Sequence, residues 1–551
     1  MAGRVGIIGG GSSGITAVKN LLDAGFSDVV CYERRDVIGG LWYFKEDTST
    51  WKDESCVNRS TVINTSKEFM AFSDYPMPDY YPNFCHNEDV EAYFLDYSQH
   101  FGVDKYIQRN TEVMYLKKHS SYNSTGRWEM RLKNHKTGQE TTEVFDFIIV
   151  ANGHHGAPNL PSIPGLDKFT GKTMHSKDFK DVRSVTGKKA VVLGIGNSGG
   201  DVSVELSKYM KVFLCTRRGA WILNRLVDNG LPWDYFVHVR LASYMLSWLP
   251  RSYRNKLLKD KLNQKFCHDL YHLTPVHEPD ATHPTVNDEL PNRIAAGMVK
   301  VKPNIRSFTE KGVTFEDGTH EEEIDLVVFA TGYKVEYPFI EKSVLEVRHN
   351  KVELYKYMWL PVLPKQTIAF LAVCQPLGAM FPIAELQSRL AARVFKGEVT
   401  LPSPANMKKD IAAKERALQA RYVHTDRHTI QVDWLPYMDE LAELTGCKPN
   451  LVKLLFTDPP LFWQVIAGPC VPYQYRLHGP NSWPGARQAI FTVLDRIKKP
   501  FETRPLPKRE GRKPSLFKRL FVTSALIGAV FAVAAYKKEN ILDYIPRLRT
   551  I

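Results

Sequence analysis

Two glycine-rich turns contain the residues whose types and spacing most clearly suggest chemistry. The turns begin at Gly9 and Gly194, and in both the glycines follow the pattern G-x-G-x-x-G. Such a turn lets the backbone approach a pyrophosphate closely and directs the N-terminus of the following helix toward it. We therefore predict two dinucleotide sites. Their candidate residues are Gly9, Gly10, Gly11, Ser12, Ser13 and Gly14 in the first turn, and Gly194, Gly196, Asn197, Ser198 and Gly199 in the second.

The residues at the end of the next strand differ in charge between the two units. In the first, the apolar run of residues 28–32 ends at Glu33, whose carboxylate can accept hydrogen bonds from a ribose diol and would repel a 2′-phosphate. In the second, the strand ends at Thr216, Arg217 and Arg218, and an arginine guanidinium suits a 2′-phosphate. The first site should therefore bind FAD or NAD and the second NADPH, unless the two arginines are a solvated pair on a loop.

The elements around these turns should be buried parallel strands followed by helices. Residues 5–8 and 189–193 are short apolar runs, which are typical of such strands, and a helical pattern follows each turn. A chain of 551 residues is also too long for one compact core. We predict an α/β fold with two Rossmann-like dinucleotide-binding domains and a further helix near the C-terminus.

That C-terminal helix should attach the protein to a membrane. Residues 520–536 form an uncharged apolar run with basic residues on both sides, and at about 1.5 Å per residue such a helix is at the short end of a bilayer crossing. Crossing the bilayer, lying in its interface and packing as a buried terminal helix are all left open. The N-terminal residues enter a strand directly, without a signal peptide, so the catalytic part should stay in the cytosol.

Charge and cysteine usage argue against other classes of protein. The net charge is +13, but the basic excess is concentrated in residues 498–519, and no recognition motif combines it with aromatic residues, which disfavours nucleic-acid binding. The eight cysteines are scattered and include no C-x-x-C pair. We therefore expect neither a disulfide scaffold nor a metal site.

Several further motifs resemble those of the flavin-containing monooxygenase family, which includes the dimethylaniline monooxygenases. The resemblance covers essentially the whole chain, and within the family it is strongest to the vertebrate isoform-five branch. The family motifs are GGLW at residues 39–42, NTSKEFMAFSDYPMP at 64–78, FTGKTMHSKDF at 169–179, VNDELPNRI at 286–294, VFATGY at 328–333 and QYRLHGPNSWPGAR at 474–487. The branch assignment depends on ANGHHGAP at 151–158, LPNRI at 290–294 and RYVHTDRHTIQ at 421–431.

This resemblance implies an enzyme that uses FAD, NADPH and O2. The reduced flavin would react with O2 to give a C4a-(hydro)peroxyflavin, which oxygenates soft nitrogen or sulfur nucleophiles of xenobiotics or inserts oxygen into ketones in the Baeyer–Villiger manner. A small lipophilic substrate, membrane lipid and a location at the endoplasmic reticulum membrane are implied, and homo-oligomerisation is left open. One alternative is an uncoupled NADPH oxidase that produces H2O2. Another, a pyridine-nucleotide–disulfide reductase, is disfavoured because no C-x-x-C lies near the flavin site.

The resemblance also implies residues of the active site. Asn64 matches the family's asparagine near the N5/C4a edge of the flavin and is the leading catalytic candidate, although outside this family such a residue is more often part of a turn. Thr65 would lie beside it, and His175 matches a histidine with a structural role in the linker between domains. Further FAD contacts are expected from Gly40, Leu41 and Trp42, and no role is assigned to His154, His155 or His283.

The order of the motifs implies a discontinuous arrangement of domains. Residues 1–165 and 330–445 would form the FAD-binding domain, and residues 166–329 the NADPH-binding domain. An insertion at 219–286 is either a core helix pair or a wall of the substrate tunnel that also contacts the membrane. The chain would end with a return segment at 446–497, a basic linker at 498–519 and the anchoring helix at 520–536.

Overall fold

The computed structural model describes residues 3–47, 49–50, 54–425 and 427–505. Residues 1–500 form one compact unit. Across the described ranges, no helix has both the length and the apolar character that a membrane crossing requires. The predicted anchoring helix at 520–536, and the basic linker from residue 506 onward, lie outside the described residues.

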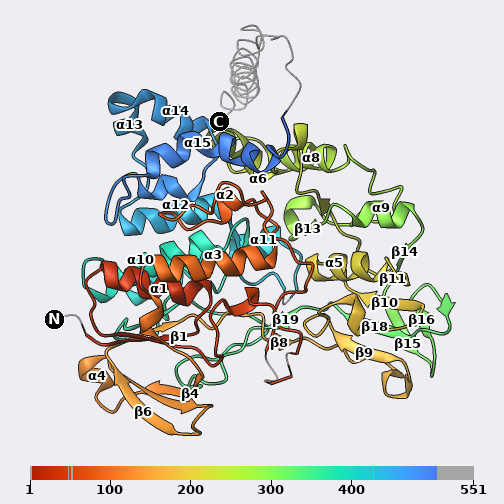
Figure 1. The fold of residues 1–551 in the computed structure, drawn as a ribbon, viewed down its shortest axis with the longest axis horizontal. Helices are drawn as coiled ribbons and strands as arrows, with labels where there is room; N and C mark the ends of the chain where they lie inside the picture. The colour runs from red at the N-terminus through yellow and green to blue at the C-terminus, as the bar shows by residue number, and fades with distance from the viewer. Residues whose placement is uncertain (1–2, 48, 51–53, 426, 506–551) are drawn as a thin grey trace, which may run out of the picture. The chain divides into compact units, whose positions relative to one another are not determined.

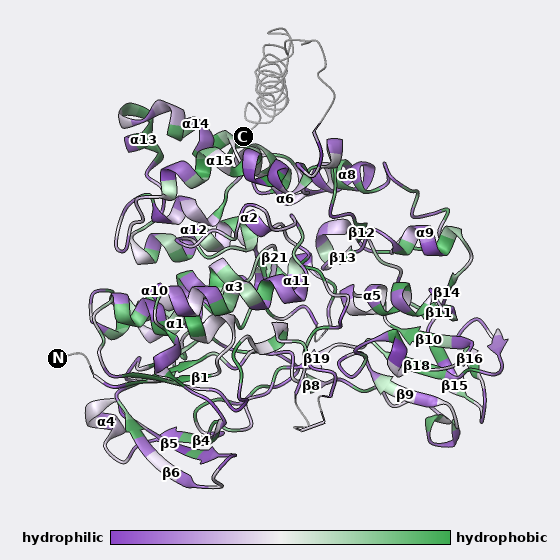
Figure 2. Cartoon of the chain, in the orientation of Figure 1, coloured by the Kyte–Doolittle hydropathy of each residue, from purple (hydrophilic) through white to green (hydrophobic). Residues whose placement is uncertain are grey.

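The first sheet holds the first glycine-rich turn at the carboxyl end of its central strand (Figure 1). Its five strands are parallel, in the order β20-β7-β1-β2-β3. The central strand is mainly hydrophobic (Figure 2) and fully buried, as expected for a parallel strand covered on both faces. The strands are β1 (Val5–Ile8), β2 (Val29–Tyr32), β3 (Ile107–Gln108), β7 (Phe147–Val150) and β20 (Ile368–Phe370).

The second sheet repeats this plan around the second turn. Its five strands are parallel as well, in the order β14-β11-β10-β18-β9, and the turn follows the central strand β10. The two sheets confirm the prediction of a mixed α/β fold. The strands are β9 (Lys172–His175), β10 (Lys189–Leu193), β11 (Lys211–Cys215), β14 (Val299–Lys302) and β18 (Leu326–Phe329).

Helices begin directly after each turn and cover the sheets. In the first sheet, α1 (Ser12–Asp23) packs against α10 (Phe381–Phe395) and α3 (Asn87–His100). In the second, α5 (Asn197–Leu206) packs against β10 and α9 (Leu290–Ala295). Each turn is therefore fixed between a buried strand and a packed helix.

The chain passes between the two sheets twice, and the two passages are paired. Strand β8 (Ala157–Pro158) on the way out hydrogen-bonds antiparallel to β19 (Tyr333–Lys334) on the way back. His175 Nε2 lies 3.0 Å from the carbonyl oxygen of Gly332 beside this pair. The first sheet thus receives strands from before and after the second sheet in sequence.

Smaller sheets and further helices complete the unit. The insertion contributes α6 (Asp234–Val237), α7 (Arg240–Ser247) and α8 (Arg251–Leu262), and α7 contacts α14 (Pro459–Ala467). The remaining strands are β4 (Thr111–Lys118), β5 (Trp128–Asn134), β6 (Glu140–Phe145), β12 (Ile222–Leu223), β13 (Thr285–Val286), β15 (Ile305–Phe308), β16 (Val313–Phe315), β17 (His320–Glu321), β21 (Gln375–Leu377) and β22 (Gln431–Asp433). The remaining helices are α2 (Lys67–Met70), α4 (Tyr122–Thr125), α11 (Pro404–Arg421), α12 (Trp434–Thr445), α13 (Leu451–Thr457) and α15 (Ala486–Lys498).

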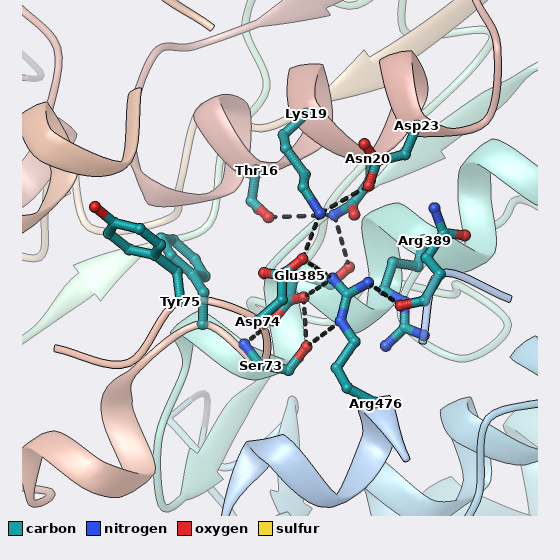
Figure 3. Close-up of polar contacts among 12 residues, drawn as sticks. Thr16, Lys19, Asn20, Asp23, Ser73, Asp74, Tyr75, Glu385, Arg389 and Arg476 are labelled. Carbon is teal, nitrogen blue, oxygen red and sulfur yellow. Dashed lines mark hydrogen bonds and ion pairs between the residues drawn. The ribbon is translucent and has the colours of Figure 1, made fainter. Parts of the chain in front are cut away.

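A buried ionic network fastens the return segment to the first sheet's helices (Figure 3). Arg476, which is 1% exposed, donates from Nη2 to Glu385 Oε1 of α10 at 2.5 Å and lies 2.8 Å from Asp74 Oδ2. Its Nε donates to Ser73 Oγ at 2.7 Å, and Lys19 of α1 pairs with the same Asp74. Four segments that are distant in sequence are thereby joined around the scaffold of the first turn.

Candidate functional site

The first turn closes so tightly that Gly9 and Gly14 cannot be replaced without displacement of the backbone. Gly9 has a φ of +102°, and a Cβ on it would lie 2.7 Å from the carbonyl oxygen of Ala151. A Cβ on Gly14 would lie 1.8 Å from the carbonyl oxygen of Gly9. The third glycine therefore lets α1 begin in contact with the turn, so that the helix N-terminus faces the same space as the turn.

The strand end and the Gly39–Gly40 segment both contact this turn. Glu33, only 6% exposed, accepts hydrogen bonds from the backbone N–H of Gly10 at 2.7 Å and of Arg35 at 3.0 Å. Arg35 Nη2 donates to the carbonyl oxygen of Gly40 at 2.7 Å, and Gly39 N–H donates to Gly10 at 3.1 Å. The structure thus brings together Gly10, Glu33 and Gly40, three of the residues that the sequence assigned to one site.

The second turn has the same geometry and an additional brace. Gly194 has a φ of +111°, and a Cβ on Gly199 would lie 1.9 Å from the carbonyl oxygen of Gly194. Asn197 Oδ1 accepts a hydrogen bond from Val286 N–H at 2.8 Å. Thr285 Oγ1 donates to the carbonyl oxygen of Ile195. Strand β13 therefore holds the second turn in place, a contact that the sequence did not indicate for Asn197.

A cavity of about 720 Å³ opens over the second turn. Arg217 and Arg218 line it at the end of β11, where both side chains are exposed. Neither the first turn nor Asn64 is among the described residues that line it. The lining includes Gly194, Gly196, Asn197, Ser198, Gly199, Thr216, Arg217, Arg218, His154, His155, His283 and Arg427.

Three residues of the insertion hold the loop that carries Asn64. Arg225 Nη2 donates to Asn64 Oδ1 at 2.7 Å, and Trp233 Nε1 donates to the Asn64 carbonyl oxygen at 3.0 Å. Two residues on, Ser66 donates from its backbone N–H and its hydroxyl to the carboxylate of Asp234, at 2.6 and 2.9 Å. These partners lie 161 to 169 residues away from the loop in sequence, and no local sequence pattern predicts the contacts.

The carboxyl group of Asp234 is electrostatically unusual. Asp234 is fully buried, and this burial raises its pKa to about 7, although the hydrogen bonds from Ser66 act in the opposite direction. A group with this pKa changes its charge close to neutral pH. The loop of Asn64 is therefore held by a carboxyl group whose protonation depends on ordinary changes of pH.

The histidines at the cavity are aromatic wall residues in their neutral form. The ring centroids of His154 and His155 lie 4.2 Å apart with their planes tilted by 38°, and the ring centroid of His155 lies 5.2 Å from that of Tyr333. Desolvation lowers the pKa of His154 to about 4, and desolvation with the neighbouring His154 lowers that of His155 to about 3. Desolvation and then Arg427 lower the pKa of His283 to about 3. These shifts favour the neutral form of the three imidazoles.

The thiol of Cys31, beside the first turn, is protonated and donates a hydrogen bond. Cys31 Sγ donates to the carbonyl oxygen of Gly9 at 3.4 Å. Burial and then the charge of Glu33 raise the pKa of the Cys31 thiol strongly. A thiolate at this position is strongly disfavoured, which argues against dithiol chemistry beside the first turn.

Comparison with known proteins identifies relatives along the whole chain. A family model described as flavin-binding monooxygenase-like matches residues 2–535. Flavin-containing monooxygenase 5 of Rattus norvegicus is 48% identical over 504 residues, covering 91% of this chain and 93% of that protein. The fold is similar to that of the S-allyl-L-cysteine S-oxygenase from Allium sativum, with a TM-score of 0.62, 22% identity, and coverage of 91% of this chain and 99% of that one. Cyclohexanone monooxygenase from Rhodococcus sp. Phi1 bound to NADP+ gives a TM-score of 0.57 at 17% identity, with coverage of 81% and 97%.

Proposed function

The chain belongs to the family of flavin-binding monooxygenases, whose cofactors are FAD and NADPH, and from this we propose that it uses NADPH and O2 to oxygenate small lipophilic molecules. The substrates would be soft nitrogen or sulfur nucleophiles, or ketones that accept an oxygen atom by Baeyer–Villiger insertion. When bound, FAD takes a hydride from NADPH and activates O2. The observation that carries the proposal is the pair of equivalent turns, with Glu33 after one and Arg217 and Arg218 after the other.

The two turns fit the diphosphates of these cofactors. Helices α1 and α5 start after Gly11 and Gly196, and neither helix has a side-chain hydrogen bond that caps its N-terminus. The first backbone N–H groups of a helix have no partner within it, so they are suited to bind an anion. FAD would be held by the first turn with Glu33 and residues 40–42, and NADPH by the second turn with residues 216–218.

Asn64 would act on the flavin through its amide donor. A guanidinium only donates hydrogen bonds, so the contact with Arg225 fixes Oδ1 as the atom that accepts. The amide NH2 is then the group of Asn64 that is oriented for donation to a ligand. Thr65 is buried beside it. In this role the Asn64 side chain would orient the flavin and shield it, and it would not take up a proton.

Product analysis tests the proposed reaction. The full-length, flavin-loaded enzyme is given NADPH and, separately, a tertiary amine, a sulfide and a ketone, while NADPH loss, H2O2 and oxygenated product are quantified by absorbance and mass spectrometry. At least one class should be oxygenated in step with NADPH consumption. If every class yields only H2O2 in equal amount to the NADPH consumed, the protein is the uncoupled oxidase instead.

Replacing Asn64 tests its place in the site. Asn64→Ala should retain FAD and NADPH oxidation but release several-fold more H2O2 per NADPH, because the flavin loses one oriented donor. Asn58→Ala, a second asparagine on the same segment, serves as the matched control. Equal H2O2 yields in the two variants would remove Asn64 from the site.

Domain organisation and location form a further part of the proposal. The FAD half would comprise residues 1–165 and 330–445, and the NADPH half residues 166–329. The apolar run at 520–536 would anchor the chain to the endoplasmic reticulum membrane, with its catalytic part in the cytosol. Deletion of residues 515–551 should give flavin-loaded enzyme in the soluble fraction, and a deletion product that still sediments with membranes would contradict the anchor.

A further inference from the structure

A third arginine lies over the second turn, and it comes from the opposite half of the chain. Arg427 lies between α11 and β22, in the segment assigned to the FAD half. Its Nη2 is only 3.1 Å from the position that a Cβ on Gly196 would occupy. Gly196 immediately precedes α5, so the guanidinium lies directly against the start of this helix and lines the same cavity.

The structure describes no counterion for Arg427 within residues 3–47, 49–50, 54–425 and 427–505. Among the described residues no carboxylate forms an ion pair with it, whereas Arg421 in the same segment pairs with Asp433 at 2.6 Å. The side chain of Arg427 is exposed to the cavity, so its guanidinium can reach an anion there. A guanidinium that shares its donors with no acidic side chain can direct all of them to such an anion. The position therefore favours a ligand that supplies negative charge.

The surroundings of Arg427 are positive on the cavity side. Arg427 helps to lower the pKa of both His283 and His428, after the larger effect of desolvation. Arg218 adds to the shift of His428 in the same direction. The described groups that face Arg427 across the cavity are thus cationic or neutral.

We propose that Arg427 binds the diphosphate of the nicotinamide nucleotide, so that the FAD half supplies a phosphate contact to the cofactor held on the second turn. This inference rests on the proposed use of NADPH. The assignment to the diphosphate follows from position, because Gly196 and the start of α5 are the parts of such a turn that face a pyrophosphate. Arg217 and Arg218 lie instead at the end of β11, where the adenosine ribose binds. Nucleotide binding would therefore link the two halves of the molecule.

Three nucleotides separate the roles of the arginines. Dissociation constants of NADP+, NAD+ and adenosine 2′-monophosphate are measured on oxidised, flavin-loaded enzyme by calorimetry. Arg427→Ala should weaken NADP+ and NAD+ by a similar factor of about ten to a hundred, since one charge-assisted contact is lost from both. Adenosine 2′-monophosphate has no diphosphate, so its affinity should be unchanged. Replacing Arg217 and Arg218 together should weaken NADP+ and adenosine 2′-monophosphate but not NAD+.

Control variants distinguish the loss of the Arg427 contact from misfolding. They also distinguish failure of this inference from failure of the proposed function. Arg416→Ala, on an exposed face of α11, should leave all three affinities unchanged, and Arg427→Lys should restore part of the loss. Flavin absorbance and the thermal midpoint confirm that each variant is folded. Unchanged NADP+ and NAD+ affinities in Arg427→Ala, or a loss confined to NADP+, overturns this inference alone. A wild-type enzyme that binds neither NADP+ nor NADPH overturns the proposed function as well.

Discussion

The third glycine of each turn offers a direct test of which cofactor binds where. A Cβ on Gly199 would lie 1.9 Å from the carbonyl oxygen of Gly194, and a Cβ on Gly14 would lie 1.8 Å from that of Gly9. The two substitutions to alanine thus apply the same perturbation to two equivalent sites. Gly200 provides the matched control, because its Cβ would meet only side-chain atoms, at 3.3 Å or more.

The expected effect follows from the distance that must be gained. Non-bonded carbon and oxygen atoms approach to roughly 3.3 Å, so the start of α5 must retreat from the turn by about 1.4 Å in Gly199→Ala. A hydrogen bond of about 2.9 Å does not survive such a displacement. Losing one charge-assisted bond from the helix N-terminus to the diphosphate costs about 1.5–3 kcal/mol, which weakens NADP+ by about ten- to more than a hundredfold.

The assay compares both cofactors in each variant. Flavin content is read from the visible spectrum of purified protein, and NADP+ affinity is measured by calorimetry. Gly199→Ala should keep FAD and lose NADP+ affinity, Gly14→Ala should lose FAD, and Gly200→Ala should change neither by more than a few-fold. The reasoning is refuted if Gly199→Ala and Gly200→Ala bind NADP+ equally well.

Two further predictions concern stability. Arg476→Ala leaves Glu385 buried without its cationic partner and Asp74 paired with Lys19 alone, and it should lower the free energy of unfolding in urea by about 3–5 kcal/mol. Arg487→Ala, at an exposed ion pair, should change this free energy little, and equal losses in the two variants would contradict the network. Because burial raises the pKa of Asp234 to about 7, the folded protein holds this proton more tightly than the unfolded chain, and the residue lowers stability progressively from about pH 4 to about pH 7. Asp234→Asn removes this dependence, so its thermal midpoint relative to wild type should rise across that range, and a difference that is constant with pH would disprove the shift.

The sequence was informative wherever the chemistry depends on neighbours along the chain. The turns, their strands and the charged strand ends lie within about thirty residues in each unit, and backbone geometry dictates glycine at Gly9 and Gly194, where φ is positive. The same reasoning anticipated that Glu33 would end a buried strand beside the first turn. Assignment of these residues to their ligands stays a prediction.

Contacts between distant segments could not be anticipated in this way. Arg225, Trp233 and Asp234 hold the Asn64 loop across more than 160 residues, and Arg476 reaches Glu385 across 91. In the sequence, the motif RYVHTDRHTIQ around Arg427 indicated only a branch of the family. The local pattern of residues does not predict which distant element the Arg427 side chain will contact.

The sequence by itself therefore determined the two glycine-rich turns with their strands and helices, the opposite charges at their strand ends and the family to which the chain belongs. Local periodicity and backbone sterics act over a few residues, and these are the forces that a sequence pattern records. Tertiary structure alone decided that Asp234 supports the Asn64 loop and that Arg427 lies against Gly196 of the second turn. Burial and electrostatic pairing depend on what packing brings together, so a buried carboxyl group or an unpaired guanidinium becomes visible only in the folded chain.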